Sequence, residues 1–224
     1  MCTINEQLVF SGIEVITDPD HPDKVISWVT QFYRGKYIDS LRYFASGPGT
    51  MKDIRLVELK DGRVGVFTRP QGNEAGRGQI GFTTIPTIED LNDETFLKAH
   101  ILRDQFVKEE WGGANEAHLL KNGNVGILGH IASMDESGNK HYYSMVFMLN
   151  PLTLEKSPLK IIAARSDFPV GPGKRPGLED IVFSGGLIRL ADNRAILSVG
   201  VSDAEAYQIL IPDPFVEYEE YGRG

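Results

Sequence analysis

Short apolar strands, each introduced by a tight turn, recur along this chain. The repeated motif occupies residues 5–10, 61–67, 122–128 and 192–197. Its Asp-Gly and Asn-Gly turns readily adopt the positive φ that a two-residue hairpin needs. The turns start at residues 5, 61, 122 and 192, and these intervals of 56, 61 and 70 residues fit propeller blades with loop insertions. The pattern therefore predicts an all-β fold of repeated antiparallel sheets.

Alternating runs of β-branched and aromatic residues predict the individual strands of these sheets. The runs cover residues 8–16, 26–33, 54–59, 63–68, 79–84, 117–120, 125–131, 142–149, 161–164, 181–183, 195–201 and 207–211. Between them, residues 90–102 carry apolar positions roughly on one helical face and predict a short helix. The Gly-rich stretches at 72–81 and 171–177 are typical of loops between strands, so we expect one domain over residues 1–224.

A carboxylate opens the strand that precedes each of the last three turns. These acids are Asp53, Glu116 and Asp180. In a propeller the first strand of each blade lines the central funnel, so the three side chains should converge there. The first repeat shows no such strand, and the matching acid would fall before Met1. We therefore expect the chain to begin inside a blade, and its open sheet edges predict self-association.

Composition narrows the function classes. The 224 residues are 41% hydrophobic and 24% charged, with no pattern typical of a signal peptide or membrane span, so a cytoplasmic location is expected. A net charge of −8 argues against nucleic-acid binding and favours small-molecule partners. The single cysteine excludes an internal disulfide, and the Cys and His spacing predicts no metal site. The Gly-x-Gly-x-x-Gly match at 76–81 runs into a strand, so no dinucleotide cofactor is expected.

Unusual polar strings stand in the expected loops and at strand starts, at residues 32–35, 47–55, 68–72, 111–118, 129–131, 183–187 and 201–205. They resemble glycosyltransferase family 108, formerly a domain of unknown function, which contains the mannosyltransferase-phosphorylases of β-1,2-mannan metabolism. The resemblance extends from about Trp28 to Phe215. It implies a five-bladed β-propeller similar in fold to the family-130 mannoside phosphorylases, with about four blades present here and the first missing.

This resemblance also implies an inverting chemistry. One acid protonates the glycosidic oxygen while a cationic pocket holds phosphate on the opposite face of the sugar. The expected ligands are a sugar or sugar phosphate and inorganic phosphate. Candidate phosphate-binding residues in or beside the strings are Arg34, Lys52, Arg55, Arg69, His130, Lys174 and Arg175. Candidate sugar-binding residues are Asp53, Asn115, Glu116, Asp180, Asp203 and Trp111, of which Trp111 could stack on a pyranose.

The catalytic acid is not identified among these residues. In the family it lies on an Asp-Pro-Phe string at the start of the second blade, and its counterpart is expected upstream of Met1. The Asp-Pro-Phe string at Asp213 ends a strand and is not expected to replace it. Three hypotheses stay open: an enzyme whose acid is supplied, a catalytically silent sugar-binding or scaffold propeller, and a glycoside hydrolase. An acid beside Arg or Lys is also commonly a structural ion pair.

Overall fold

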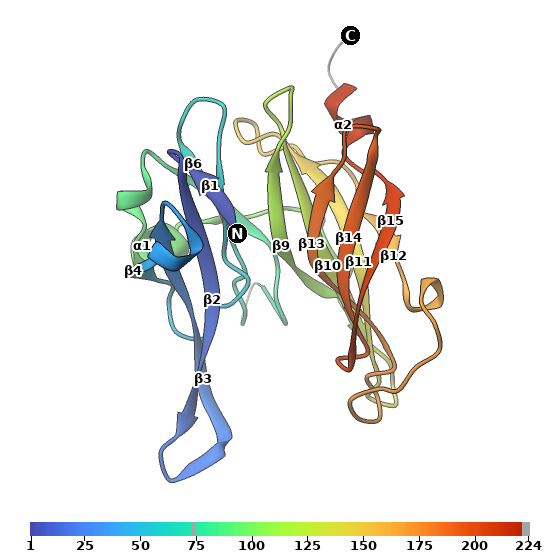
Figure 1. Cartoon of the computed structure of the whole chain (residues 1–224). Coiled ribbons are helices and arrows are strands. Elements are labelled where there is room, and N and C mark those ends of the chain that lie inside the picture. The colour runs from blue at the N-terminus through green and yellow to red at the C-terminus, as the bar shows by residue number, and fades with distance from the viewer. Residues whose placement is uncertain (73–74, 221–224) are drawn as a thin grey trace. The chain divides into compact units, whose positions relative to one another are not determined.

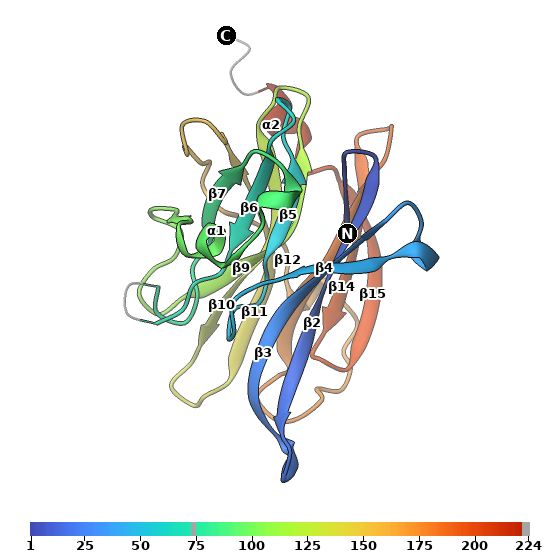
Figure 2. The same cartoon turned by 90° about the vertical axis from the view of Figure 1, so that its left-hand side faces the viewer.

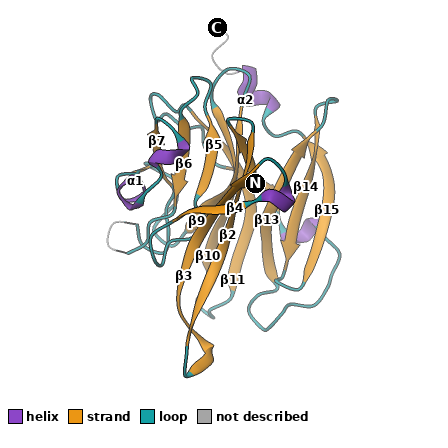
Figure 3. Cartoon of the chain, turned by 60° about the vertical axis from the view of Figure 1, so that its left-hand side comes forward, coloured by secondary structure: helices purple, strands orange, loops and turns teal. Residues whose placement is uncertain are grey.

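The computed structural model describes residues 1–72 and 75–220. Strands make up most of the described chain, with only short helices between them (Figure 3). The all-β prediction is thus confirmed. The chain divides into two compact units, Met1–Leu102 and Arg103–Gly224.

The first unit contains two antiparallel sheets, each in sequential strand order. One consists of β1 (Cys2–Ile4), β2 (Gln7–Asp18), β3 (His21–Gly35) and β4 (Arg42–Ser46). The other consists of β5 (Arg55–Glu58), β6 (Val64–Thr68), β7 (Gly81–Ile85) and β8 (His100–Ile101). The repeated turns join β1 to β2 and β5 to β6. The expectation that the first repeat lacks a leading strand is wrong, because the three-residue β1 pairs with the start of β2.

The β2–β3 hairpin is much longer than its neighbours. β1 reaches β2 only as far as Val9, and β4 pairs with β3 only over Gln31–Arg34. Beyond these points the hairpin continues as a two-stranded ribbon, whose tip extends past the other strands of its unit (Figure 2). Its exposed apolar side chains are Phe10, Ile13, Val15, Ile16, Val25 and Ile26.

Short helical turns connect the strands of the first unit. They are η1 (Ile38–Ser40), η2 (Ile88–Asp90) and α1 (Asp93–Leu97). The helix predicted over residues 90–102 is therefore only five residues long. The Asn92 side chain caps α1 by accepting from the Thr95 amide at 3.1 Å, which fixes where the helix begins. Phe96 is buried and anchors the turn to the core.

The second unit is built from two meanders (Figure 1). The first contains β9 (Trp111–Leu119), β10 (Val125–Met134), β11 (Lys140–Leu149) and β12 (Lys160–Ala163), and the second contains β13 (Asp180–Arg189), β14 (Arg194–Val201) and β15 (Glu205–Pro212). Repeated turns again join the first two strands of each meander. A parallel pairing of β11 with β13 connects the meanders, through His141 with Asp180 and Tyr142 with Ile181.

Each unit has its own apolar core. In the first unit the core includes Phe32, Ile54, Val64, Val66 and Phe96. In the second unit it joins both meanders and includes Leu128, Val146, Leu187, Leu197 and Phe215. Full burial of one such side chain contributes about 1.5–3 kcal/mol to the free energy of folding. These cores are therefore the main source of stability of the two units.

The chain after β15 is fixed to the same core. Asp213 Oδ1 accepts from the Phe215 amide at 3.0 Å, and α2 (Val216–Glu220) follows. Arg189 Nε donates to Asp213 at 2.7 Å, and its Nη1 donates to Glu219 at 2.8 Å. The Asp-Pro-Phe string thus closes the last strand and binds it to β13, as expected from its position.

Candidate functional site

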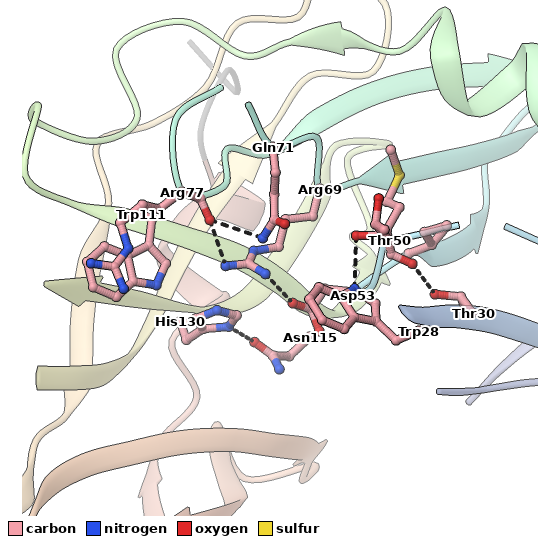
Figure 4. A network of polar contacts seen from close by, with 12 residues as sticks. Trp28, Thr30, Thr50, Asp53, Arg69, Gln71, Arg77, Trp111, Asn115 and His130 are labelled. Carbon is pink, nitrogen blue, oxygen red and sulfur yellow. Dashed lines mark hydrogen bonds and ion pairs between the residues drawn. The ribbon is translucent and has the colours of Figure 1, made fainter. Parts of the chain in front are cut away.

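A buried ion pair forms the centre of the polar network in the first unit. Arg69 Nη1 lies 3.4 Å from Asp53 Oδ2, and the two side chains are 4% and 8% exposed (Figure 4). Asp53 lies two residues before β5, and Arg69 directly follows β6. Because β5 and β6 are adjacent and antiparallel, the start of one lies beside the end of the other. Strand pairing thus brings together a predicted sugar-binding residue and a predicted phosphate-binding residue.

Contacts with β3 hold the segment that carries Asp53. Trp28 Nε1 donates to the Thr50 carbonyl at 2.9 Å, and Thr30 Oγ1 donates to the Met51 carbonyl at 3.2 Å. Asp53 has a φ of 60°, a left-handed conformation that Asp and Asn tolerate better than most residues. The backbone conformation therefore contributes to the presence of Asp at this position.

The loop after Arg69 closes over its guanidinium group. Arg69 Nη2 donates to the Arg77 carbonyl at 3.3 Å, and Gln71 Nε2 donates to the same oxygen at 3.2 Å. A Cβ at Gly78 would lie only 2.7 Å from Arg69 Nε, and Gly78 has a φ of 138°. Glycine at 78 thus permits both the loop conformation and the close contact with Arg69.

The other predicted cations of the first unit have partners of their own. Arg34, on β3, pairs with Glu89 at 2.5 Å and lies over the Phe44 ring. This ion pair lowers the pKa of Glu89, first through the hydrogen bond from Arg34. Arg55 Nη1 donates to the Ile54 carbonyl at 2.8 Å. The exposed Lys52 places its ammonium 5.8 Å from the centre of the Trp28 ring.

In the second unit, His130 is buried on β10. Its Nδ1 lies 2.8 Å from Asn115 Oδ1, and because an amide oxygen only accepts, Nδ1 carries the hydrogen (Figure 4). The His130 ring stacks on Tyr142, with centroids 5.7 Å apart, and contacts Phe183 at 4.7 Å. The predicted pair of Asn115 and His130 is thus a hydrogen-bonded unit with a fixed tautomer.

Trp111 begins β9, and its side chain is buried beside the same aromatic group. Its Nε1 donates to Tyr142 Oη at 3.2 Å, and the two rings meet edge to face. Trp111 is therefore part of a strand, although the sequence predicted a strand only from residue 117. β9 begins six residues before the predicted strand at 117–120, and its first four residues, which include Trp111, are buried.

Glu116 connects the two meanders of the second unit. Its Oε2 accepts from the Leu187 amide at 2.7 Å and lies 3.6 Å from His118 Nε2. Burial acts to raise the pKa of Glu116, but interactions with His118 and the Leu187 amide outweigh it and lower the pKa. Glu116 is therefore an ionised carboxylate near neutral pH, held between β9 and β13.

Asp180 lies in a second polar cluster at the start of β13. His141 Nδ1 approaches Asp180 Oδ2 at 2.7 Å, and Tyr143 Oη donates to the same oxygen at 2.6 Å. The hydrogen bond to Asp180 raises the pKa of His141. Burial, followed by the bond to Asp180, raises the pKa of Tyr143 to about 12, so Tyr143 is a stable hydrogen-bond donor.

The remaining predicted residues are exposed. Lys174 and Arg175 lie on the loop before β13, where the Lys174 amide donates to the Ser202 carbonyl at 3.0 Å. Asp203 is in the hairpin between β14 and β15 with a φ of 52°. This left-handed conformation explains an Asp in the turn without reference to a ligand.

Sequence reasoning missed His118, His141 and Tyr143. The two-residue spacing of Glu116 and His118 on one strand places both on the same face, which is a signal that could have been used. Within residues 1–72 and 75–220, no group of three or more His, Cys, Asp or Glu side chains is arranged to hold a metal ion. The same residues contain no helix long and apolar enough to cross a membrane.

A family model for a protein of unknown function, DUF1861, matches residues 1–217. The chain belongs to this family. This membership agrees with the resemblance that the polar strings show to glycosyltransferase family 108. Among the curated proteins, no match was found.

Three solved structures similar to this chain come from Leishmania. MPT-4 of Leishmania mexicana, a mannose phosphorylase solved with a phosphate ion, is 38% identical, with a TM-score of 0.87, covering 96% of this chain and 66% of MPT-4. MPT-1 of the same organism, a GDP-Man-dependent mannosyltransferase, is 34% identical, with a TM-score of 0.84, covering 99% and 68% respectively. A hypothetical protein from Leishmania major is 36% identical, with a TM-score of 0.82, covering 96% and 66%. The chain thus spans about two thirds of the length of these proteins.

Proposed function

We propose that this chain binds a β-mannoside together with phosphate or a mannosyl-phosphate donor, and that it acts in the phosphorolysis or synthesis of β-1,2-mannosides. The observation that carries this proposal is its 38% identity, over nearly its whole length, to a mannose phosphorylase solved with phosphate. The similarity to a GDP-Man-dependent mannosyltransferase supports the mannosyl specificity but allows either donor.

The polar residues of the two units are proposed to bind different parts of the ligands. In the first unit, Lys52, Arg55 and Arg69 are the candidate phosphate ligands, because Lys52 precedes β5, Arg55 begins it and Arg69 follows the adjacent β6. Arg69 is already paired with Asp53, so phosphate would share its guanidinium with that carboxylate. In the second unit, Glu116 and Asp180 are candidate acceptors for sugar hydroxyls, and His130 and Lys174 are candidate anion ligands.

Incubation with β-1,2-mannobiose and phosphate tests the proposal. Phosphate-dependent release of mannose 1-phosphate is the expected product, and GDP-mannose with a mannose acceptor tests the alternative donor. Release of free mannose without phosphate would instead identify a glycoside hydrolase. If none of these reactions occurs, calorimetric titration with mannose 1-phosphate decides whether binding persists. Absence of both turnover and binding would contradict the proposal.

Binding without turnover is the second candidate function. It stays open because no residue of the chain is identified as the proton donor. A silent mannoside-binding protein would bind mannose 1-phosphate and mannobiose but release no product from either. The same titration, combined with the product assay, separates it from an enzyme.

We also propose that the two sheets of the first unit and the two meanders of the second unit are blades of a five-bladed β-propeller type. Support comes from one shared feature, a repeated tight turn that joins the first two strands of each of them, although the last has three strands and the others have four. Blade edges left open would favour self-association. Size-exclusion chromatography with light scattering measures this directly, and a monomer at all concentrations would contradict the proposed association.

A further inference from the structure

Two residues without a proposed role, His141 and Tyr143, hold the side chain of Asp180 in place. His141 and Asp180 face each other across the parallel pairing of β11 with β13. Tyr143 lies two residues beyond His141 on β11 and therefore on the same face of the strand. A strand register thus places two hydrogen-bond donors beside one carboxylate.

Both donors bind the same oxygen atom. Among the described residues, the bonds from His141 Nδ1 and Tyr143 Oη both end on Asp180 Oδ2. The side chain of Asp180 is 35% exposed, so the carboxylate is held in place but accessible to solvent. Oδ1 keeps its lone pairs for an external donor, and a sugar hydroxyl is a donor of the right kind.

A second carboxylate faces the other side of His141. Asp135 Oδ2 lies 3.6 Å from His141 Nε2, which is too long for a direct hydrogen bond but close enough for charge attraction. Asp135 is itself held by Asn139, whose backbone N–H donates to Oδ1 and whose side-chain Nδ2 donates to Oδ2, both at 2.8 Å. The two carboxylates favour the charged imidazolium, so the bond to Asp180 is charge-assisted when His141 is protonated.

We propose that Asp180 accepts a sugar hydroxyl through Oδ1, and that His141 and Tyr143 are the positioning residues that hold its carboxylate for this contact. The inference rests on the proposed mannoside-binding function. It adds two residues and a direction of hydrogen bonding to that function. It also predicts that sugar affinity depends on the protonation of a residue that does not contact the sugar.

Calorimetric titrations with mannose and with mannose 1-phosphate test this proposal. Asp180→Asn should lower mannose affinity at least about tenfold, the effect of losing a hydrogen bond to a charged group. Tyr143→Phe keeps the ring and removes one donor to Oδ2, and His141→Gln removes the charge, so each should lower affinity about three- to tenfold. Melting temperatures show whether each variant is folded under the conditions of the titration.

The pH dependence separates a positioning role from a purely structural one. Wild-type affinity should fall severalfold as the pH rises through the raised pKa of His141, because the charge-assisted bond to Asp180 is then weakened. In His141→Gln the affinity should stay flat over that range. In the control Asp135→Asn, affinity below the transition should be unchanged and the fall should move to lower pH, since Asp135 also raises the pKa of His141.

The possible failures are distinguishable. If folded Asp180→Asn or His141→Gln binds mannose like the wild type, or if the wild-type affinity does not change with pH, the positioning proposal is wrong and mannoside binding stands. If the folded wild type binds neither mannose nor mannose 1-phosphate, the proposed function fails and this inference fails with it.

Discussion

Phe215 packs directly on the backbone of Gly126. A Cβ at Gly126 would lie 2.7 Å from Phe215 Cδ1, and the Phe215 ring is fully buried. The ring also contacts His118 and Tyr218, so it has little room to move away. The glycine on β10 is therefore part of how the chain after β15 attaches to the core.

Substitution of Gly126 by Ala should destabilise the fold by about 1–3 kcal/mol, the usual cost of overpacking a tight core. Gly200→Ala is the matched control, because Gly200 also lies in a strand but a Cβ there would meet nothing within 4 Å. Urea unfolding of both variants measures the difference. Equal stability of the two would show that Phe215 can move away from a Cβ at position 126.

The acid Glu219 should make stability depend on pH. Burial acts to raise its pKa, but the bonds from Arg189 and Lys121 outweigh this and lower it below the ordinary value of 4.5. The folded state therefore holds the proton less tightly than the unfolded state, and the stabilisation is complete above the unfolded pKa. It is lost as the pH falls through the folded pKa.

Glu219→Gln should remove this part of the acid sensitivity and cost about 1.5–3 kcal/mol at neutral pH, the range for hydrogen bonds to charged groups. Unfolding free energies measured from pH 7 down to pH 3 provide the check. Glu217→Gln serves as the control, because Glu217 is on the same helix and pairs with Lys160 in an exposed position. If the unfolding free energy of Glu219→Gln falls as steeply toward pH 3 as that of the wild type, Glu219 is not a source of the acid sensitivity.

Asp53→Asn should destabilise the first unit by about 3–5 kcal/mol, because it leaves the buried Arg69 guanidinium without its counter-charge. Asn tolerates the left-handed φ of 60° as well as Asp does, so the substitution changes charge and not backbone preference. Denaturant unfolding measures the loss. A change below about 1 kcal/mol, typical of exposed pairs, would mean that solvent reaches this ion pair.

Gly78→Ala should disturb Arg69 directly. Its Cβ would come within 2.7 Å of the guanidinium, and the residue would also carry the strain of a positive φ. Gly72→Ala shares the positive φ but meets nothing within 4 Å, so it isolates the contact from the backbone strain. We expect Gly78→Ala to be less stable than Gly72→Ala, and to bind phosphate more weakly if Arg69 is a ligand. Calorimetry with inorganic phosphate and thermal unfolding measure both effects.

Much of the strand order could be predicted because the turns specify it. Gly62 and Gly123 have φ values of 83° and 89°, and Asn193 has 62°, as a turn of this kind requires. Three strands were missed. β1 has only three residues, β4 has no clean alternation and β8 has only two residues, so their pairing depends on the neighbouring strands rather than on local sequence.

The candidate site was predictable only in part. Asp53, Arg69, Asn115 and His130 stood out from the sequence, but their hydrogen-bond partners depend on strand register. His141 was missed because it lies 39 residues from Asp180, and their contact arises from a parallel pairing that no local pattern encodes. Charge and spacing can select such residues, but tertiary packing decides whether a charge is neutralised, as Arg69 is by Asp53.

The length of the β2–β3 hairpin has a consequence for local unfolding. Between its tip and Trp28 the ribbon has only the ladder between its own two strands, and a two-stranded hairpin is marginally stable in water. Its amides should therefore exchange with deuterium far sooner than those of β6, whose five residues are all buried. The opening should proceed inward from the tip and stop near Trp28, whose carbonyl accepts from the Thr50 amide at 2.8 Å and whose Nε1 donates to the Thr50 carbonyl.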